Sequence, residues 1–197
     1  MADGKGRETG ARDDLLVAAV AYVGEHGVSD LSLRALAQAL GTSHRMLSYH
    51  FGSKQGLFVE IVRAVEDQQR GALADLDAQQ GLSPAERAWS FWRRLADPSL
   101  APNQRLFFEI YGQALQGRPH TTQVLDGIVE TWLGPVIELG LEQGKSAHAA
   151  RVDARLGLAV VRGLLLDLLA TGDREGVEEA MERFISWWQQ PETAPAP

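Results

Sequence analysis

Residues 32–51 read SLRALAQALGTSHRMLSYHF, and this stretch decides the fold of the front of the chain. Ser32 is a favoured N-cap for a short helix that Gly41 ends. Thr42 or Ser43 can cap a second short helix directly afterwards. We therefore expect a helix, a glycine-containing turn and a second helix. The apolar positions that can form a seam between the two helices are Leu36, Ala37, Leu40, Met46 and Leu47.

The second of these helices has a polar face of the kind that reads DNA. Arg45 can offer a bidentate fork to guanine in the major groove. Lys54, at the start of the following helix, adds a cation beside free backbone N–H groups that suit a phosphate. The alternative is that Arg45 is only solvated and that His50 only caps the end of its helix. Other side chains on this face that can reach base edges or phosphates are His44, Ser48 and Tyr49.

With these residues, positions 11–65 resemble the DNA-binding domain of the TetR family of transcriptional repressors. The resemblance covers about a quarter of the chain, and the later helices are similar to the family only in number and length. The matching residues are a helix ending in Gly27, then Leu31-Ser32-Leu33-Arg34 before Leu36-Ala37, Gly41-Thr42-Ser43, His50-Phe51, Ser53-Lys54 and Leu57.

The resemblance implies a set of DNA contacts. The family usually has a tyrosine directly after the Leu47 position, but here Ser48 stands there and Tyr49 follows. Either Ser48 replaces the tyrosine contact or Tyr49 takes it over. We include Ser48 and the capping residue Ser32 among the expected DNA-binding residues. The positions where family members touch DNA are Arg34, Thr42, Ser43, His44, Arg45, Tyr49, His50 and Lys54.

The rest of the chain predicts helices and no strands, because no alternating run of β-branched residues reaches strand length. The predicted fold is all-α: an N-terminal three-helix helix-turn-helix domain is joined by a long helix to a C-terminal helical domain for ligand binding and dimerisation. We expect a DNA-binding domain over 11–56, a regulatory domain over 57–190, and disordered tails at 1–10 and 191–197. The expected helices cover residues 11–26, 33–40, 43–51, 54–80, 84–96, 102–116, 121–143 with a bend at Gly134–Pro135, 147–171 and 173–190.

Composition and the pattern of apolar residues predict a cytoplasmic protein. The chain has no cysteine, which excludes disulfides and thiolate metal sites. The N-terminus has no apolar signal core, and the longest apolar stretch, 156–170, is interrupted by Arg162 and Asp167, so we expect neither export nor membrane insertion. The formal net charge is −7, but residues 1–56 hold six Lys or Arg and six Asp or Glu. A neutral front and an acidic rear allow one end to approach DNA.

Aromatic residues cluster in the predicted C-terminal domain and can line an apolar pocket between helices. The resemblance implies such a pocket, and with it a repressor that a small apolar or amphipathic effector releases from a palindromic operator. The alternatives are that these aromatics fill the core and that the regulator has no small-molecule ligand. The expected lining residues are Trp89, Trp92, Phe108, Tyr111, Ile128 and Trp132.

The last two predicted helices carry wide apolar surfaces that suit a two-fold, four-helix seam in a homodimer. Dimerisation is also favoured because one short recognition helix reads few base pairs. The alternative is that both helices close the core of their own domain. The expected seam residues are Leu158, Val161, Leu165, Leu168, Met181, Phe184, Ile185 and Trp188.

An all-α enzyme is the remaining class. The segment ending in Gly144-Lys145-Ser146 resembles a phosphate-binding loop, but Leu139 stands where that motif needs its first glycine. The five histidines are scattered, with no paired-ligand spacing. We therefore expect no catalytic residues, no metal and no cofactor.

Overall fold

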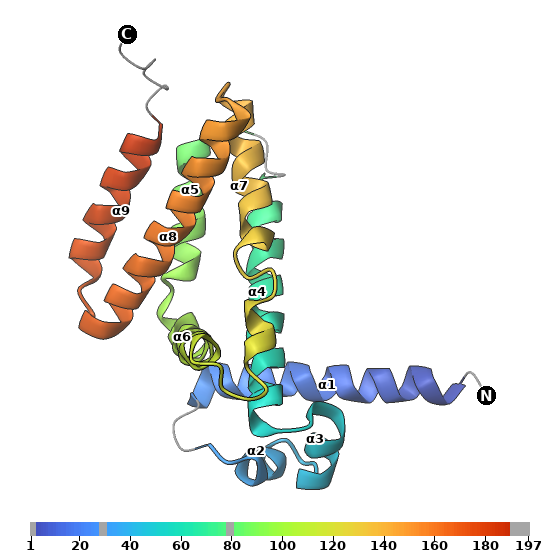
Figure 1. Cartoon of the computed structure of the whole chain (residues 1–197). Helices are drawn as coiled ribbons and strands as arrows, with labels where there is room; N and C mark the ends of the chain where they lie inside the picture. The colour runs from blue at the N-terminus through green and yellow to red at the C-terminus, as the bar shows by residue number, and fades with distance from the viewer. Residues whose placement is uncertain (1–2, 28–30, 78–80, 190–197) are drawn as a thin grey trace. The chain divides into compact units, whose positions relative to one another are not determined.

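The computed structural model describes residues 3–27, 31–77 and 81–189, and every regular element within these ranges is helical (Figure 1). The predicted all-α class is confirmed. The elements are α1 (Asp3–His26), α2 (Leu33–Ala39), α3 (His44–Phe51), α4 (Lys54–Asp77), α5 (Pro84–Leu95), η1 (Pro98–Leu100), α6 (Ala101–Leu115), η2 (Thr122–Leu125), α7 (Glu130–Glu142), α8 (Ala147–Thr171) and α9 (Arg174–Trp188), where η marks a 3₁₀ helix.

The helices form two compact units. Unit 1 comprises Met1–Gln68 and Pro98–Asp126, and unit 2 comprises Gln69–Asp97 and Gly127–Pro197. Unit 1 holds α6 as well as the first three helices, because α6 packs against α1. Gly24 of α1 lies so close to α6 that an added Cβ would be 3.5 Å from Asn103 Nδ2. A separate DNA-binding domain that ends at residue 56 stays a prediction.

Serine caps start the short helices of unit 1, as the sequence predicts. The Ser32 hydroxyl accepts the Ala35 N–H at 3.1 Å, and the Ser43 hydroxyl accepts the Met46 N–H at 3.1 Å. These bonds satisfy backbone donors that have no partner within the helix. The almost fully buried apolar side chains of unit 1 include Ala19, Val23, Leu36, Ala37, Leu47 and Leu57.

Three expectations about unit 1 and its border are wrong. Residues 3–10 belong to α1, where we expected a disordered tail. Met46 is 41% exposed, so it is not part of the seam between α2 and α3. The helix expected over 121–143 is interrupted, because Gly127 takes a left-handed φ of +70° between η2 and α7. Pro135 lies inside α7, and a bend there stays a prediction.

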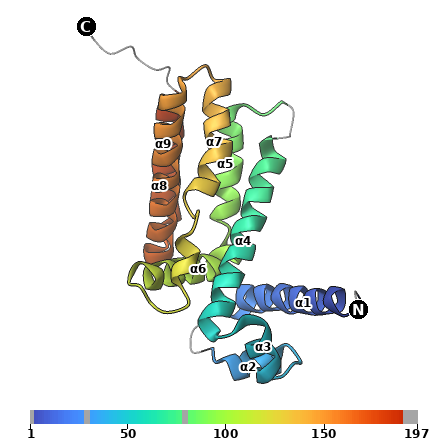
Figure 2. The same cartoon turned by 45° about the vertical axis from the view of Figure 1, so that its right-hand side comes forward.

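Unit 2 contains α5, α7, α8 and α9, with α7 and α8 side by side in both views (Figures 1 and 2). The two helices nearly touch at Gly140, where an added Cβ would lie 2.9 Å from the Ala150 Cβ. At the start of α7 the link is a side chain, because Arg162 donates to the Ile128 carbonyl at 2.7 Å. The hairpin is therefore tight at one end and bridged by an arginine at the other.

Lys145 fastens the connection between α7 and α8 to the end of α9. Its side chain is only 9% exposed, and its Nζ donates to Asp153 Oδ2 at 2.6 Å and to the Trp188 carbonyl at 3.0 Å. The same ammonium lies 4.9 Å from the centre of the Trp188 ring. The Lys145 ammonium thus has a carboxylate, a carbonyl and an aromatic ring as partners, and it is largely shielded from water.

The N-terminus of α5 has a capping box. The Ser83 hydroxyl accepts the Glu86 N–H, and the Glu86 carboxylate accepts the Ser83 N–H at 2.8 Å. Hydrogen bonds from the Ser83 side chain, and then from its backbone, lower the pKa of Glu86.

Across the described ranges, no helix is both long enough and apolar enough to cross a membrane.

Candidate nucleic-acid interface

The turn between α2 and α3 holds the two helices in a fixed relation. Gly41 has a φ of +64°, a conformation that suits glycine. The Thr42 N–H donates to the Ala37 carbonyl at 2.9 Å and closes the end of α2. Leu36 and Leu47 are buried on the inner sides of α2 and α3. One side of α3 is thereby anchored, and the other is left to solvent.

The structure places most of the expected DNA-binding residues at the surface. Arg45 in particular forms no hydrogen bond or ion pair with any residue in the described part of the chain, so its five N–H groups are available. Thr42, Ser48, His50 and Lys54 are half-buried. The exposed members of the set are Ser32, Arg34, Ser43, His44, Arg45 and Tyr49.

The two candidates for the usual tyrosine contact differ in exposure. Tyr49 is 65% exposed, and its ring lies edge-on to His50 with 5.1 Å between the ring centres. Ser48 is half-buried, and its carbonyl accepts the Gly52 N–H at 2.9 Å. The His50 Nε2 is buried and has no hydrogen-bond partner among the described residues. Exposure favours Tyr49 for the contact, and a phosphate contact by His50 stays a prediction.

Lys54 stands at the first position of α4, directly after the short loop that follows α3. Its Nζ lies 5.2 Å from the centre of the Phe58 ring, one turn further along α4. The Ser53 hydroxyl accepts the Gly56 N–H at 3.0 Å and caps this helix end. The Lys54 ammonium and the N-terminus of α4 both attract a negatively charged group, such as a phosphate.

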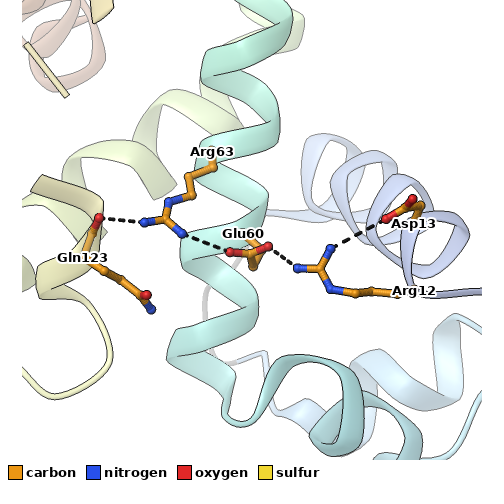
Figure 3. Close-up of polar contacts among 5 residues, drawn as sticks. All are labelled: Arg12, Asp13, Glu60, Arg63 and Gln123. Atoms are coloured by element: carbon orange, nitrogen blue, oxygen red, sulfur yellow. Dashed lines mark hydrogen bonds and ion pairs between the residues drawn. The ribbon is translucent and has the colours of Figure 1, made fainter. Parts of the chain in front are cut away.

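A chain of polar contacts between charged side chains joins α1, α4 and η2 (Figure 3). Sequence reasoning missed it. The Glu60 carboxylate on α4 accepts hydrogen bonds from Arg12 on α1 and, at 3.2 Å, from Arg63. Arg63 also donates to the Gln123 carbonyl in η2 at 2.7 Å. Only the Glu60–Arg63 spacing of three residues is visible in the sequence, since Arg12 and Gln123 are distant along the chain.

The expected ligand-lining residues are divided between the two units. Phe108 and Tyr111 belong to unit 1, whereas Trp89, Trp92, Ile128 and Trp132 belong to unit 2. Several aromatic rings pack on neighbours within their own unit, such as Phe107 on Tyr111 with 5.6 Å between centres. A cavity of about 470 Å³ in unit 1 has none of the expected residues in its lining, which consists of Gln55, Gln113, Gln116, Arg118, Pro119 and His120.

Among the buried N–H donors of unit 2 that have no hydrogen-bond partner within the described ranges, two lie on almost fully buried side chains. They are the Nε1 of Trp92 and the Nε2 of Gln69, on side chains that are 1% and 2% exposed. The Gln69 Oε1 accepts a hydrogen bond from Arg94 Nε at 3.0 Å. Since a guanidinium only donates, this bond fixes the amide orientation and leaves its NH₂ group as the unpaired end.

Half of the expected dimer seam is buried inside the single chain. Leu165, Met181, Ile185 and Trp188 are at most 8% exposed, so they belong to the core of unit 2, as in the alternative interpretation. Leu158, Val161, Leu168 and Phe184 are half-buried. Sequence reasoning missed an exposed, uncharged face of α8, which we call the α8 stripe, formed by Val152, Leu156, Ala159, Gly163, Leu166 and Ala170.

Metal binding finds no support in the part of the chain that the structure describes, since no group of three His, Cys, Asp or Glu side chains is placed to hold an ion. The arrangement of α2, α3 and the start of α4 instead suits contact with a phosphate backbone and base edges.

Comparison with known proteins agrees with this geometry. Residues 15–61 match the family described as bacterial regulatory proteins of the tetR family. The HTH-type transcriptional repressor AcnR of Corynebacterium glutamicum is 33% identical over 182 residues, which cover 89% of this chain and 91% of AcnR. The HTH-type transcriptional regulator BetI of Agrobacterium fabrum is 34% identical over 77 residues, or 39% of this chain and 37% of BetI.

Similarity to solved structures extends over nearly the whole chain. The crystal structure of a transcriptional regulator from Rhodococcus sp. RHA1 is similar with a TM-score of 0.74 and 22% identity, covering 93% of this chain and 99% of that one. At this level of identity the likeness concerns the fold. The likeness includes the helices beyond residue 65, which the sequence alone showed to be similar to the family only in their number and length.

Proposed function

The chain belongs to the TetR family of bacterial regulatory proteins, and on that premise we propose that it binds a palindromic operator as a homodimer in the cytoplasm and is released by a small apolar or amphipathic ligand. It is a DNA-binding transcriptional regulator, as its relatives are, and not an enzyme. The observation that carries the proposal is the exposed Arg45 on the outer face of α3, above a buried and capped inner face.

Replacing Arg45 by alanine is expected to cost about 1–3 kcal/mol on the operator and to relax base preference at one position, because a bidentate contact to a base edge is lost. Lys54→Ala is the matched control. It is expected to weaken operator and random DNA alike and to reduce the salt slope by about one, as for a phosphate contact. Equal losses on both DNAs for Arg45→Ala would remove Arg45 from base readout.

The operator itself is obtained by selecting bound sequences from a random DNA pool, with and without an extract of candidate metabolites. We expect a two-fold symmetric consensus whose half-sites are one helical turn apart, because a dimer presents two copies of α3. Loss of bound DNA in the presence of the extract would support an effector. A pool without enrichment would contradict sequence-specific DNA binding by this protein.

A ligand site in unit 2 is supported by the two buried donors on Gln69 and Trp92. An unpaired buried donor costs roughly 1–3 kcal/mol, so a guest with acceptor atoms would gain by pairing with it. Such a guest acts only if its affinity differs between the DNA-binding form and the released form. A regulator of this family without any small-molecule ligand, in which these aromatics only fill the core, stays the alternative.

The α8 stripe supports dimerisation better than the residues we expected from the sequence. Its members recur at intervals of four and three, carry no charge, and include Leu166 at 51% exposure. Trp187 on the neighbouring α9 is 48% exposed. A helix face of this kind suits the same face of a second copy, since a two-fold interface is self-complementary.

Leu166→Arg is expected to raise the dimer dissociation constant by at least about 30-fold, because each interface then buries two unpaired charges. Light scattering over a dilution series measures the change. Val17→Arg, at an exposed position on α1 of unit 1, is the control and should leave the dimer intact. A Leu166→Arg protein that stays dimeric at the same concentrations as the wild type would argue against the α8 stripe.

A further inference from the structure

Glu60 connects three segments of unit 1 through its two carboxylate oxygens. Oε2 accepts a hydrogen bond from Arg12 on α1, and Oε1 accepts one from Arg63 at 3.2 Å. The second guanidinium continues to the Gln123 carbonyl at 2.7 Å. Figure 3 shows the resulting line of contacts from α1 through α4 to η2.

Arg12 also reaches the last residue of α3. The carbon at the centre of its guanidinium lies 5.3 Å from the centre of the Phe51 ring, a distance typical of cation–π contact. Phe51 is 7% exposed and anchors the end of the helix that carries Arg45. Through this contact, the position of the Arg12 side chain influences the position of the end of α3.

The side chains of this ion-pair network are partly shielded from water, so the network can hold a defined geometry. The side chains of Arg12, Glu60 and Arg63 are 34%, 25% and 43% exposed, and the Glu60 carboxylate has a cationic partner on each oxygen. A pair of this kind holds its geometry better than a fully exposed surface pair, which contributes little. Glu60 is also an acidic group close behind a surface that must approach DNA, which is unfavourable for affinity by itself.

We propose that Glu60 is a positioning residue for operator binding: by holding Arg12 and Arg63 together, it fixes the end of α3 relative to α1 and η2. The inference rests on the proposed DNA-binding function. Base contacts by Arg45 require an accurate placement of α3, whereas phosphate contacts depend mainly on charge. Loss of Glu60 therefore affects the two kinds of DNA binding differently.

The test compares Glu60→Gln with the wild type on the selected operator and on random duplex at one salt concentration. We expect the affinity for the operator to fall about 3- to 30-fold, the range of measured long-range couplings. We expect the affinity for random DNA to stay equal or rise, because a negative charge is removed. A loss of affinity for the operator without a loss of affinity for random DNA is the signature of positioning.

Other roles for Glu60 give different results. A purely electrostatic role would raise both affinities, and a role in stability alone would lower both by the same factor together with the unfolding temperature; either outcome overturns the proposal. Glu25→Gln is the matched control, since it removes the same charge from an exposed site on α1, where the Glu25 carboxylate lies 3.9 Å from His26 Nδ1. We expect it to leave the ratio of operator to random affinity unchanged.

Arg12→Gln and Arg63→Gln keep the proposal testable if Glu60→Gln folds poorly. Each should lower the ratio of operator to random affinity, and combining either with Glu60→Gln should lower it no further than the stronger single variant, because coupled residues are not additive. Additive losses would overturn the proposal. If the wild type itself enriches no sequence, the proposed function fails, and this outcome is distinct from a wild-type ratio in Glu60→Gln.

Discussion

Replacing Gly56 by alanine is expected to lower the free energy of unfolding by about 2 kcal/mol and to disturb the end of α3. An added Cβ would lie 2.3 Å from the Phe51 carbonyl oxygen, which is backbone and cannot turn aside as a side chain can. Overpacking costs about 1–3 kcal/mol, whereas a glycine-to-alanine change inside a helix gains at most about 1 kcal/mol. The clash therefore decides the sign.

Chemical denaturation measures this effect, and the same helix provides the control. Apart from the adjoining helix backbone, nothing lies within 4 Å of a Cβ added at Gly71 of α4, so Gly71→Ala is expected to stabilise the protein by up to about 1 kcal/mol. Gly56→Ala should also lose operator affinity, because α3 must shift to make room for the methyl group. A Gly56→Ala protein as stable as Gly71→Ala would show that the junction of α3 and α4 is looser than described.

Removing the partner of Lys145 is the second change with a large expected effect. Asp153→Ala leaves a cation that is only 9% exposed without its carboxylate, although the Trp188 carbonyl and ring remain in contact with it. Breaking a buried ion pair costs about 3–5 kcal/mol, and the remaining contacts lead us to expect the lower end, about 3 kcal/mol. Denaturant unfolding of the full chain measures the loss.

The double variant Lys145→Met with Asp153→Leu separates the unpaired charge from the lost packing. We expect it to recover most of the stability, since an apolar pair of similar size removes the need to solvate either charge. Asp126→Ala, at an exposed position, is the control for loss of an aspartate and should change stability by less than about 0.5 kcal/mol. A double variant as unstable as Asp153→Ala would mean that the contacts of Lys145 provide stability that an apolar pair cannot replace.

Local signals predicted the helix-turn-helix elements well. Ser32 and Ser43 cap α2 and α3 as expected, and Gly41 ends α2, because capping and turn chemistry depend on residues within one or two turns. Leu36 and Leu47 are buried for the same reason, since helical spacing places them on the inner faces. Met46 has the same apolar character as Leu47 but lies one residue earlier, about 100° around the helix, and is exposed.

Features that depend on distant residues were not predictable. Gly127 interrupts a helix whose apolar pattern runs on without a break, so periodicity alone extended it. Met181 and Ile185 are apolar whether they face their own core or a partner, and only the packing of α9 shows that they are buried. Arg12 and Glu60 are 48 residues apart, and a single sequence contains no sign of their contact.

The close approach at Gly140 determines how the α7–α8 hairpin can deform. Because the two helices are already in close contact there and Lys145 is hydrogen-bonded to the Trp188 carbonyl beside them, we expect this end of the hairpin to resist displacement. At the other end, a long arginine side chain joins Arg162 to the Ile128 carbonyl and can follow a displacement by changing rotamer. A displacement of α7 relative to α8 is therefore expected to be larger near Ile128 than near Gly140.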